Sequence, residues 1–112
     1  MEEKEGILKE NFFEYYNLGL STFEDKKYNS ATTLFFKAII ALCDIYILRK
    51  EGRIPTSHAD RFRLAEEKFG EIYLIIDRDF PFYQDSYTKK LDKEAAELIK
   101  NDIEKIRKIL GI

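Results

Sequence analysis

Apolar residues recur along the chain at steps of three and four, the spacing that places them on one face of a helix. The first helix is predicted over residues 5–24. Its apolar face consists of Leu8, Phe12, Tyr15, Tyr16, Gly19 and Phe23. A polar turn follows over residues 25–29, and Asn29 or Ser30 is expected to cap the next helix, since each side chain can accept a bond from a free backbone N–H.

The second predicted helix, over residues 30–51, is apolar nearly all round. Between residues 34 and 48 only Lys37 and Asp44 are polar, and Gly52 follows as a natural stop. A helix of this kind is either central to its domain or shared between a core and a partner surface. Because a four-helix bundle rarely surrounds one of its own helices, we expect part of this helix to form a homodimer interface.

The third helix is predicted over residues 57–76, with Ser57 and Asp60 resembling a capping box. The pattern then breaks over residues 77–90, a segment that is rich in aromatic residues and contains Pro81. We expect a loop there, and a loop of that length in a compact domain is usually functional.

The last helix is predicted to begin after Asp92, its N-cap, and to end at Gly111. Its buried stripe should consist of Ala95, Ile99, Ile103, Ile106 and Leu110. No segment has the alternation of a strand. The chain is therefore predicted to be a single all-α domain over residues 1–112, a four- to five-helix up-and-down bundle.

Composition narrows the class of protein. Apolar residues make up 45% and charged residues 36% of the sequence, with a net charge of −2, so no global basic field favours nucleic acid. The lone Cys43 excludes an internal disulfide, and one histidine excludes a His-based metal site within one subunit. We expect no cofactor. The acidic N-terminus has no signal-peptide pattern and the apolar run over residues 34–48 is too short to cross a bilayer, so we expect a cytoplasmic location and no membrane contact.

Two motifs then suggest a family. The first is an Ala-x-x-Leu-Phe-x-x-Ala pattern over residues 31–38, followed by Gly-x-x-Pro-x-x-His over residues 52–58. The second is Arg-Asp-Phe-Pro-Phe-Tyr over residues 78–83, before the last helix. In this order they resemble the HEPN domain superfamily, in particular its small stand-alone prokaryotic members, over most of residues 12–110.

The resemblance implies a four- or five-helix bundle, usually dimeric. It also implies a role as an RNA-directed toxin, as a nucleotide- or RNA-binding module, or as the partner of a minimal nucleotidyltransferase. Active members are metal-independent ribonucleases with an Arg, four to six residues, and then a His. Counted from Arg78, the histidine positions hold Tyr83, Gln84 or Asp85, so the sequence departs from that pattern. Tyrosine is a poor general base at neutral pH because its pKa is near 10.

A literal Arg-x4-His exists at Arg53 and His58, between the second and third helices. It could bind phosphate or act as a catalytic pair, because an Arg stabilises phosphate charge and a His moves protons near neutral pH. The structural interpretation is a cation at a helix end and a polar residue in a first turn.

The cluster of Arg78, Asp79 and Tyr83 also has two interpretations. It is either a structural corner, with Arg78 paired to a carboxylate, or a cleft that contacts nucleotide or RNA.

Three functions follow as hypotheses. The first is a HEPN-like module that binds nucleotide or RNA, or pairs with a nucleotidyltransferase in a toxin–antitoxin-type system, without nuclease activity. The second is a metal-independent ribonuclease that uses Arg53 with His58, or Arg78 with Tyr83. The third is a tetratricopeptide-like interaction scaffold, suggested by residues 15–38, although no second copy of that unit is found.

Overall fold

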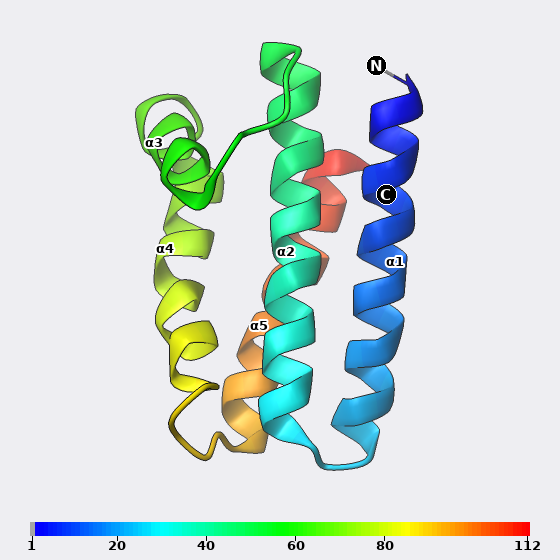
Figure 1. The fold of residues 1–112 in the computed structure, drawn as a ribbon, viewed down its shortest axis with the longest axis vertical. Helices are drawn as coiled ribbons and strands as arrows, with labels where there is room; N and C mark the ends of the chain where they lie inside the picture. Colours follow the sequence, from blue (N-terminus) through cyan, green and yellow to red (C-terminus); the bar gives the residue numbers. More distant parts are fainter. Residues whose placement is uncertain (1) are drawn as a thin grey trace.

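The computed structural model describes residues 2–112, which form five α-helices and, within that range, no strand (Figure 1). The helices are α1 (Glu2–Glu24), α2 (Tyr28–Glu51), α3 (His58–Lys68), α4 (Gly70–Asp85) and α5 (Lys93–Leu110). The prediction of an all-α bundle of four to five helices is confirmed.

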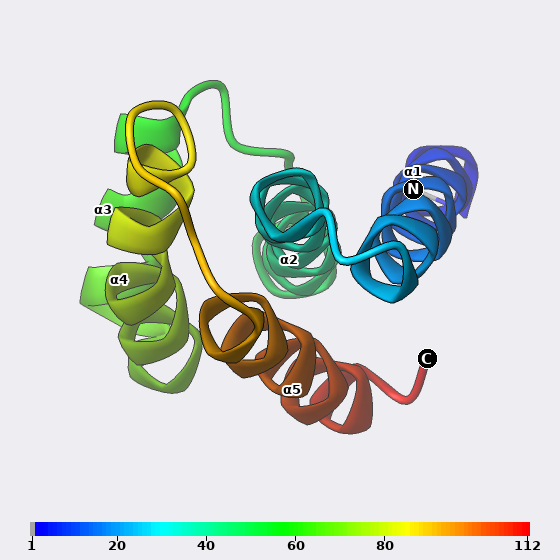
Figure 2. The same cartoon turned by 90° about the horizontal axis from the view of Figure 1, so that it is seen from below.

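The four long helices alternate in direction, and the short α3 lies crosswise to them at one side of the bundle, beside the upper end of α4 (Figure 1). Seen from below, α2 occupies the middle, with α1 on one side, α4 on the other and α5 beneath it in the picture, which is the side behind α2 in Figure 1 (Figure 2). α2 packs against α1, α4 and α5, and α3 packs on α4. One face of α2, turned toward the viewer in Figure 1, is not covered by another helix.

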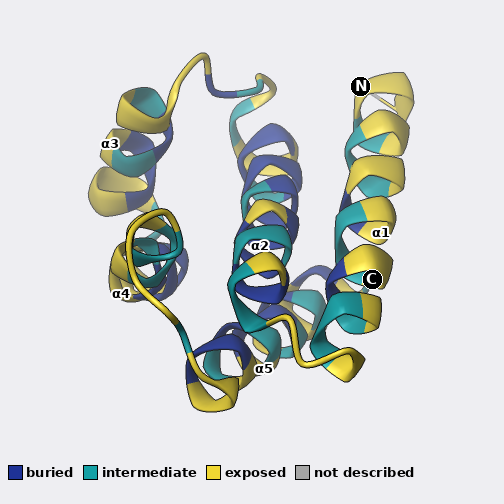
Figure 3. Cartoon of the chain, turned by 60° about the horizontal axis from the view of Figure 1, so that its bottom comes forward, coloured by how far each residue is buried: buried dark blue, intermediate teal, exposed yellow. Residues whose placement is uncertain are grey.

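The core of the bundle is built around α2, whose apolar side chains are buried along nearly its whole length (Figure 3). By length and composition alone α2 could cross a bilayer, but most of its apolar stretch is buried inside the fold, as in the core helix of a soluble protein. The rest of the chain thus covers α2 on every side but one, so most of its apolar residues are buried without a partner subunit. A homodimer stays a prediction.

The predicted ends of three helices are confirmed. Ser57 Oγ accepts a hydrogen bond from Asp60 N (3.1 Å) at the start of α3, and Asp92 Oδ1 accepts one from Ala95 N (3.0 Å) at the start of α5. Left-handed glycines end α2 and α5, with φ of 77° at Gly52 and 72° at the last glycine. Glycine is favoured in this conformation because it has no Cβ to clash.

No side-chain hydrogen bond caps α2, so the prediction that Asn29 or Ser30 caps this helix is wrong. Asn29 instead binds the connection between α4 and α5. Its amide donates to the carbonyl oxygens of Ser86 (3.0 Å) and Lys89 (2.6 Å), and its Oδ1 accepts from Leu91 N (2.8 Å). These bonds satisfy backbone groups that a loop otherwise leaves to water.

The single helix predicted over residues 57–76 is wrong, because the chain leaves helical geometry at Phe69 (φ −131°, ψ 61°) and starts α4 at Gly70. The Phe69 ring packs edge-on against Tyr46, with 5.1 Å between the ring centroids. Phe62, Phe69 and Ile76 follow one another at steps of seven residues, the spacing of one helix face. Because Phe69 stays in the apolar contact surface, this spacing continues across the break and does not indicate it.

The loop predicted over residues 77–90 is also wrong in its first part, because α4 continues to Asp85 through Pro81. Proline inside a helix costs about 3 kcal/mol or more. Aromatic packing offsets this cost: the Tyr83 ring stacks on Phe36 of α2 (4.9 Å between centroids), and Phe80 packs beside them (5.8 Å from Phe36).

The close approach of α1 and α2 depends on Gly19, and this can be tested by Gly19→Ala. An added Cβ would lie 2.6 Å from two ring carbons of the fully buried Phe35, so the ring would have to move. We expect a loss of about 1–3 kcal/mol of unfolding free energy in urea, the usual cost of overpacking. Gly6→Ala on the same helix is the control: nothing lies within 4 Å of its Cβ. That variant should equal or exceed wild type in stability, and equal stability of both variants would contradict the close contact.

Candidate functional site

A groove of about 370 Å³ lies over the uncovered face of α2, between α1 and the start of α3; we call it the α2 groove. The polar and aromatic side chains that line it are Asn11, Tyr15, Phe36, Lys37, Asp44, Thr56, Ser57, His58, Arg61 and Tyr83. They come from α1, α2, the α2–α3 connection, α3 and α4, so the groove exists only in the folded chain.

The inner wall of the α2 groove is a buried ion pair. Arg61 Nε lies 2.7 Å from Asp44 Oδ1, and Arg61 Nη2 lies 2.8 Å from Asp44 Oδ2. The side chains are only 10% and 8% exposed. A buried charge is costly unless it is paired and hydrogen-bonded, so this two-point contact fixes α3 against α2.

The third nitrogen of the Arg61 guanidinium reaches the only histidine of the sequence. Arg61 Nη1 lies 2.8 Å from His58 Nδ1, one helical turn earlier on α3. Partial burial of the ring, together with the positive charges of Arg61 and Lys37, lowers the pKa of His58 below its usual value. The imidazole is therefore neutral at physiological pH.

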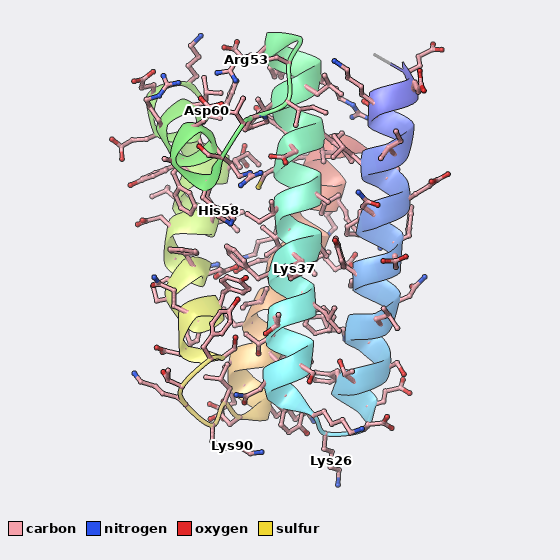
Figure 4. All side chains as sticks on the ribbon, viewed as in Figure 1. Lys26, Lys37, Arg53, His58, Asp60 and Lys90 are labelled. Atoms are coloured by element: carbon pink, nitrogen blue, oxygen red, sulfur yellow. The ribbon has the colours of Figure 1, made fainter. Side chains whose placement is uncertain are left out.

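Lys37 is the cation of the α2 groove that has no carboxylate partner among the described residues. It is exposed, and its Nζ lies 6.0 Å from the centre of the Tyr83 ring, within range of a cation–π contact. Figure 4 places Lys37 on the uncovered face of α2, with His58 beside it toward α3. Lys26 and Lys90 lie at the lower end of the bundle in Figure 4, the end opposite Arg53.

The structure does not pair Arg53 with His58. Arg53 forms two hydrogen bonds with Asp60, at 2.7 and 3.1 Å, and both residues lie above His58 in Figure 4. This bond is the main reason that the pKa of Asp60 is lowered. The Arg-x4-His spacing of Arg53 and His58 therefore does not indicate a contact between them. The arginine that contacts His58 is Arg61, three residues after it.

The other predicted cluster is divided between two sides of α4. Tyr83 lines the α2 groove, whereas Arg78 and Asp79 face α5. Arg78 Nη2 lies 2.6 Å from both carboxylate oxygens of Asp102, and Arg78 Nε lies 3.5 Å from Asp79 Oδ1. Arg78 thus makes the carboxylate contacts that the structural interpretation predicted.

Asp79 and Asp102 form a carboxyl pair with no exposed surface on either side chain. Burial, and then the hydrogen bond and negative charge of Asp102, raise the pKa of Asp79 to about 8. Burial acts on Asp102 in the same direction, but hydrogen bonds from Asp79 and Arg78 outweigh it and hold the pKa of Asp102 below its usual value. Two adjacent buried carboxyl groups do not readily both ionise, so the fold favours the protonated form of Asp79.

Sequence reasoning missed Arg61 as a site residue. It also described Lys37 and Asp44 only as the polar positions of an apolar helix. The signal was present: two charges seven residues apart lie on one side of a helix, and in an apolar helix each needs a partner or solvent. No sequence pattern, however, states that Arg61 is the partner of Asp44.

Comparison with known proteins found no relative of this chain. No family model matches the sequence, and no curated protein and no solved structure gives a significant match. The HEPN resemblance therefore stays a prediction.

The carboxyl pair predicts a stability that falls as the pH rises. In the unfolded chain an Asp titrates near 3.9, whereas the folded pKa of Asp79 is about 8. Between these values the folded state binds more protons, so the free energy of unfolding decreases with increasing pH. We expect Asp79→Asn, which resembles the protonated acid, to be more stable than wild type above pH 8 by about 1–3 kcal/mol, a typical desolvation cost for a buried polar group.

Urea unfolding of wild type and Asp79→Asn, from about pH 4 to above pH 8, would measure the difference in unfolding free energy. Asp77→Asn is the matched control, because Asp77 is on the same helix but is exposed. His58, whose pKa is lowered, acts in the opposite direction below its unfolded pKa of about 6.5. His58 contributes equally in wild type, Asp79→Asn and Asp77→Asn. Parallel curves of unfolding free energy against pH for wild type and Asp79→Asn would therefore show that Asp79 is ionised in the fold.

Proposed function

We propose that this chain is a HEPN-like helical module that binds a nucleotide or a short single-stranded segment of RNA in the α2 groove and does not cleave it. The observation that carries the proposal is Lys37, a groove cation without a carboxylate partner in the described chain. An unpaired cation in a concave site attracts phosphate, even though the protein as a whole is slightly acidic.

Two tyrosine rings support the same ligand chemistry. Tyr15 of α1 and Tyr83 of α4 line the α2 groove, and these two helices lie on opposite sides of α2 (Figure 1). Bases stack on aromatic side chains in proteins that bind single strands, and each stacked base contributes about 1–3 kcal/mol. A volume of about 370 Å³ is at the small end of ordinary ligand pockets. The α2 groove is therefore suited to one nucleotide unit at a time.

The hydrogen bonds that Arg61 makes within the protein favour binding of RNA over its cleavage. Each of its three nitrogens has a protein partner, two on Asp44 and one on His58. An arginine that stabilises a scissile phosphate must offer its guanidinium to that phosphate. Arg53 and Arg78, the arginines of the ribonuclease hypothesis, are likewise bound to Asp60 and Asp102.

The partners predicted by the resemblance, a second copy of the chain and a nucleotidyltransferase, stay predictions, as does the cytoplasmic location. The tetratricopeptide-like scaffold is less favoured because such a scaffold uses the concave surface of several stacked helix pairs. Here the pair α1–α2 is backed by α5, and the groove lies between α1 and α3 instead.

The binding proposal predicts that Lys37→Ala weakens the affinity for a fluorescein-labelled six-nucleotide RNA about tenfold. That is the loss of one charge-assisted hydrogen bond of about 1.5 kcal/mol. Fluorescence anisotropy at several salt concentrations should also show a salt slope reduced by roughly one phosphate contact. Adenosine 5′-monophosphate, measured by calorimetry, tests whether a single nucleotide suffices.

Lys90→Ala is the matched control, since Lys90 is also exposed but lies at the lower end of the bundle (Figure 4). It should bind within about twofold of wild type, because it changes the net charge identically without touching the groove. Equal weakening by both substitutions would mean nonspecific attraction, and no binding of either probe by wild type would refute the proposal.

The absence of nuclease activity is a separate prediction. Wild type and His58→Ala, incubated with the same RNA in EDTA, should both leave it intact on a denaturing gel. Cleavage by wild type that His58→Ala abolishes would instead establish the metal-independent ribonuclease. Cleavage that survives in His58→Ala would exclude His58 from the reaction.

A further inference from the structure

We infer that Arg61 is a positioning residue that keeps the proton of neutral His58 on Nε2, so that the imidazole presents a fixed hydrogen-bond donor to the ligand of the α2 groove. The hydrogen bond to a ligand rests on the function proposed above. The position of the proton on the His58 ring does not.

The chemistry of the contact defines the direction of the bond. A guanidinium has five N–H donors and no acceptor, so at 2.8 Å from Arg61 Nη1 the His58 Nδ1 must accept. A neutral imidazole that accepts on Nδ1 carries its proton on Nε2. The two nitrogens lie on different edges of the ring, so the Nε2–H is turned away from Arg61 in a side chain that lines the groove.

Arg61 is able to impose this arrangement because it cannot easily move. Its Nε and Nη2 are held by Asp44 at 2.7 and 2.8 Å, and its side chain is 10% exposed. The Phe80 ring lies beside the imidazole, with 6.1 Å between the centroids. The donor is thus held by a buried ion pair behind it and by an aromatic ring at its side.

The surroundings of His58 also keep the ring neutral. Partial burial and the positive charges of Arg61 and Lys37 disfavour a second proton on the ring, and together they outweigh the negative charge of Asp44, which acts in the opposite direction. A neutral Nε2–H can donate to a phosphate or carbonyl oxygen, but it cannot accept a proton there from a ribose hydroxyl. The same contact therefore provides a binding group and withholds a general base.

Nitrogen NMR tests the ring directly, because His58 is the only histidine in the sequence. Long-range proton–nitrogen correlation of the uniformly labelled wild type at neutral pH should show a single Nε2–H tautomer with a hydrogen-bonded Nδ1. Arg61→Lys keeps the positive charge near Asp44 but removes the planar fork that reaches both partners. We expect its two ring nitrogens to shift toward the averaged values of an unconstrained imidazole.

Arg63→Lys is the matched control, because Arg63 is on the same helix and bonds to Asp60 instead of His58. Its imidazole spectrum should equal that of wild type. An Nδ1–H tautomer or averaged nitrogen shifts in wild type, or nitrogen shifts unchanged in a folded Arg61→Lys, would overturn the inference.

If Arg61→Lys does not fold, a pH titration of wild type tests the contact between Arg61 and His58 instead. Protonation of Nδ1 must break the bond from Arg61, so the guanidinium signals of Arg61 should shift with the same midpoint as the imidazole when the pH is lowered. Independent midpoints would overturn the inference.

Adenosine 5′-monophosphate added to wild type should shift the Nε2–H signal and leave Nδ1 bonded. If the nucleotide does not bind, the proposed function fails while the tautomer result is unaffected. If the nucleotide binds and shifts only the Nδ1 signal, His58 does not donate from Nε2 to the ligand, and this part of the inference fails.

Discussion

Asp44 carries a buried negative charge on α2, the helix against which α1, α4 and α5 pack, and a buried carboxylate is costly unless a cation pairs with it. Arg61 neutralises it from α3, through two bonds that also restrict how α3 can lie against α2. Removal of one member of such a pair typically costs about 3–5 kcal/mol, because the other charge stays buried. The position of α3, the inner wall of the α2 groove and the orientation of His58 all depend on this contact.

The α3 segment shows how far local sequence rules reach. Ser57 and Asp60 fix the start of the helix within a few residues of chain, and the sequence was sufficient to predict it. The break at Phe69 and the helix through Pro81 were not predictable in this way. Both depend on aromatic partners on α2, Tyr46 for Phe69 and Phe36 for the rings of α4, which lie more than twenty residues away in sequence.

The candidate site was predictable only in part, for the same reason. His58 and Tyr83 were identified from motifs, and both line the α2 groove. The arginines chosen with them, Arg53 and Arg78, have carboxylate partners of their own on α3 and α5. Sequence spacing identifies residues that could meet, but which cation meets which anion is decided by the packing of helices. Arg61 could be identified only once α2 and α3 were placed together.

The charges near the groove therefore fall into two kinds. Those of Asp44 and Arg61 are buried, and each satisfies the other, so they support the shape of the site and add little net field. Lys37 is exposed on the open face of α2, with aromatic rings near it and no opposing carboxylate in the described chain. A charge that the fold does not use is available to a ligand, and in a slightly acidic protein its effect is confined to its own surroundings. We therefore propose the α2 groove, and not the bundle surface as a whole, as the place where an anion would bind.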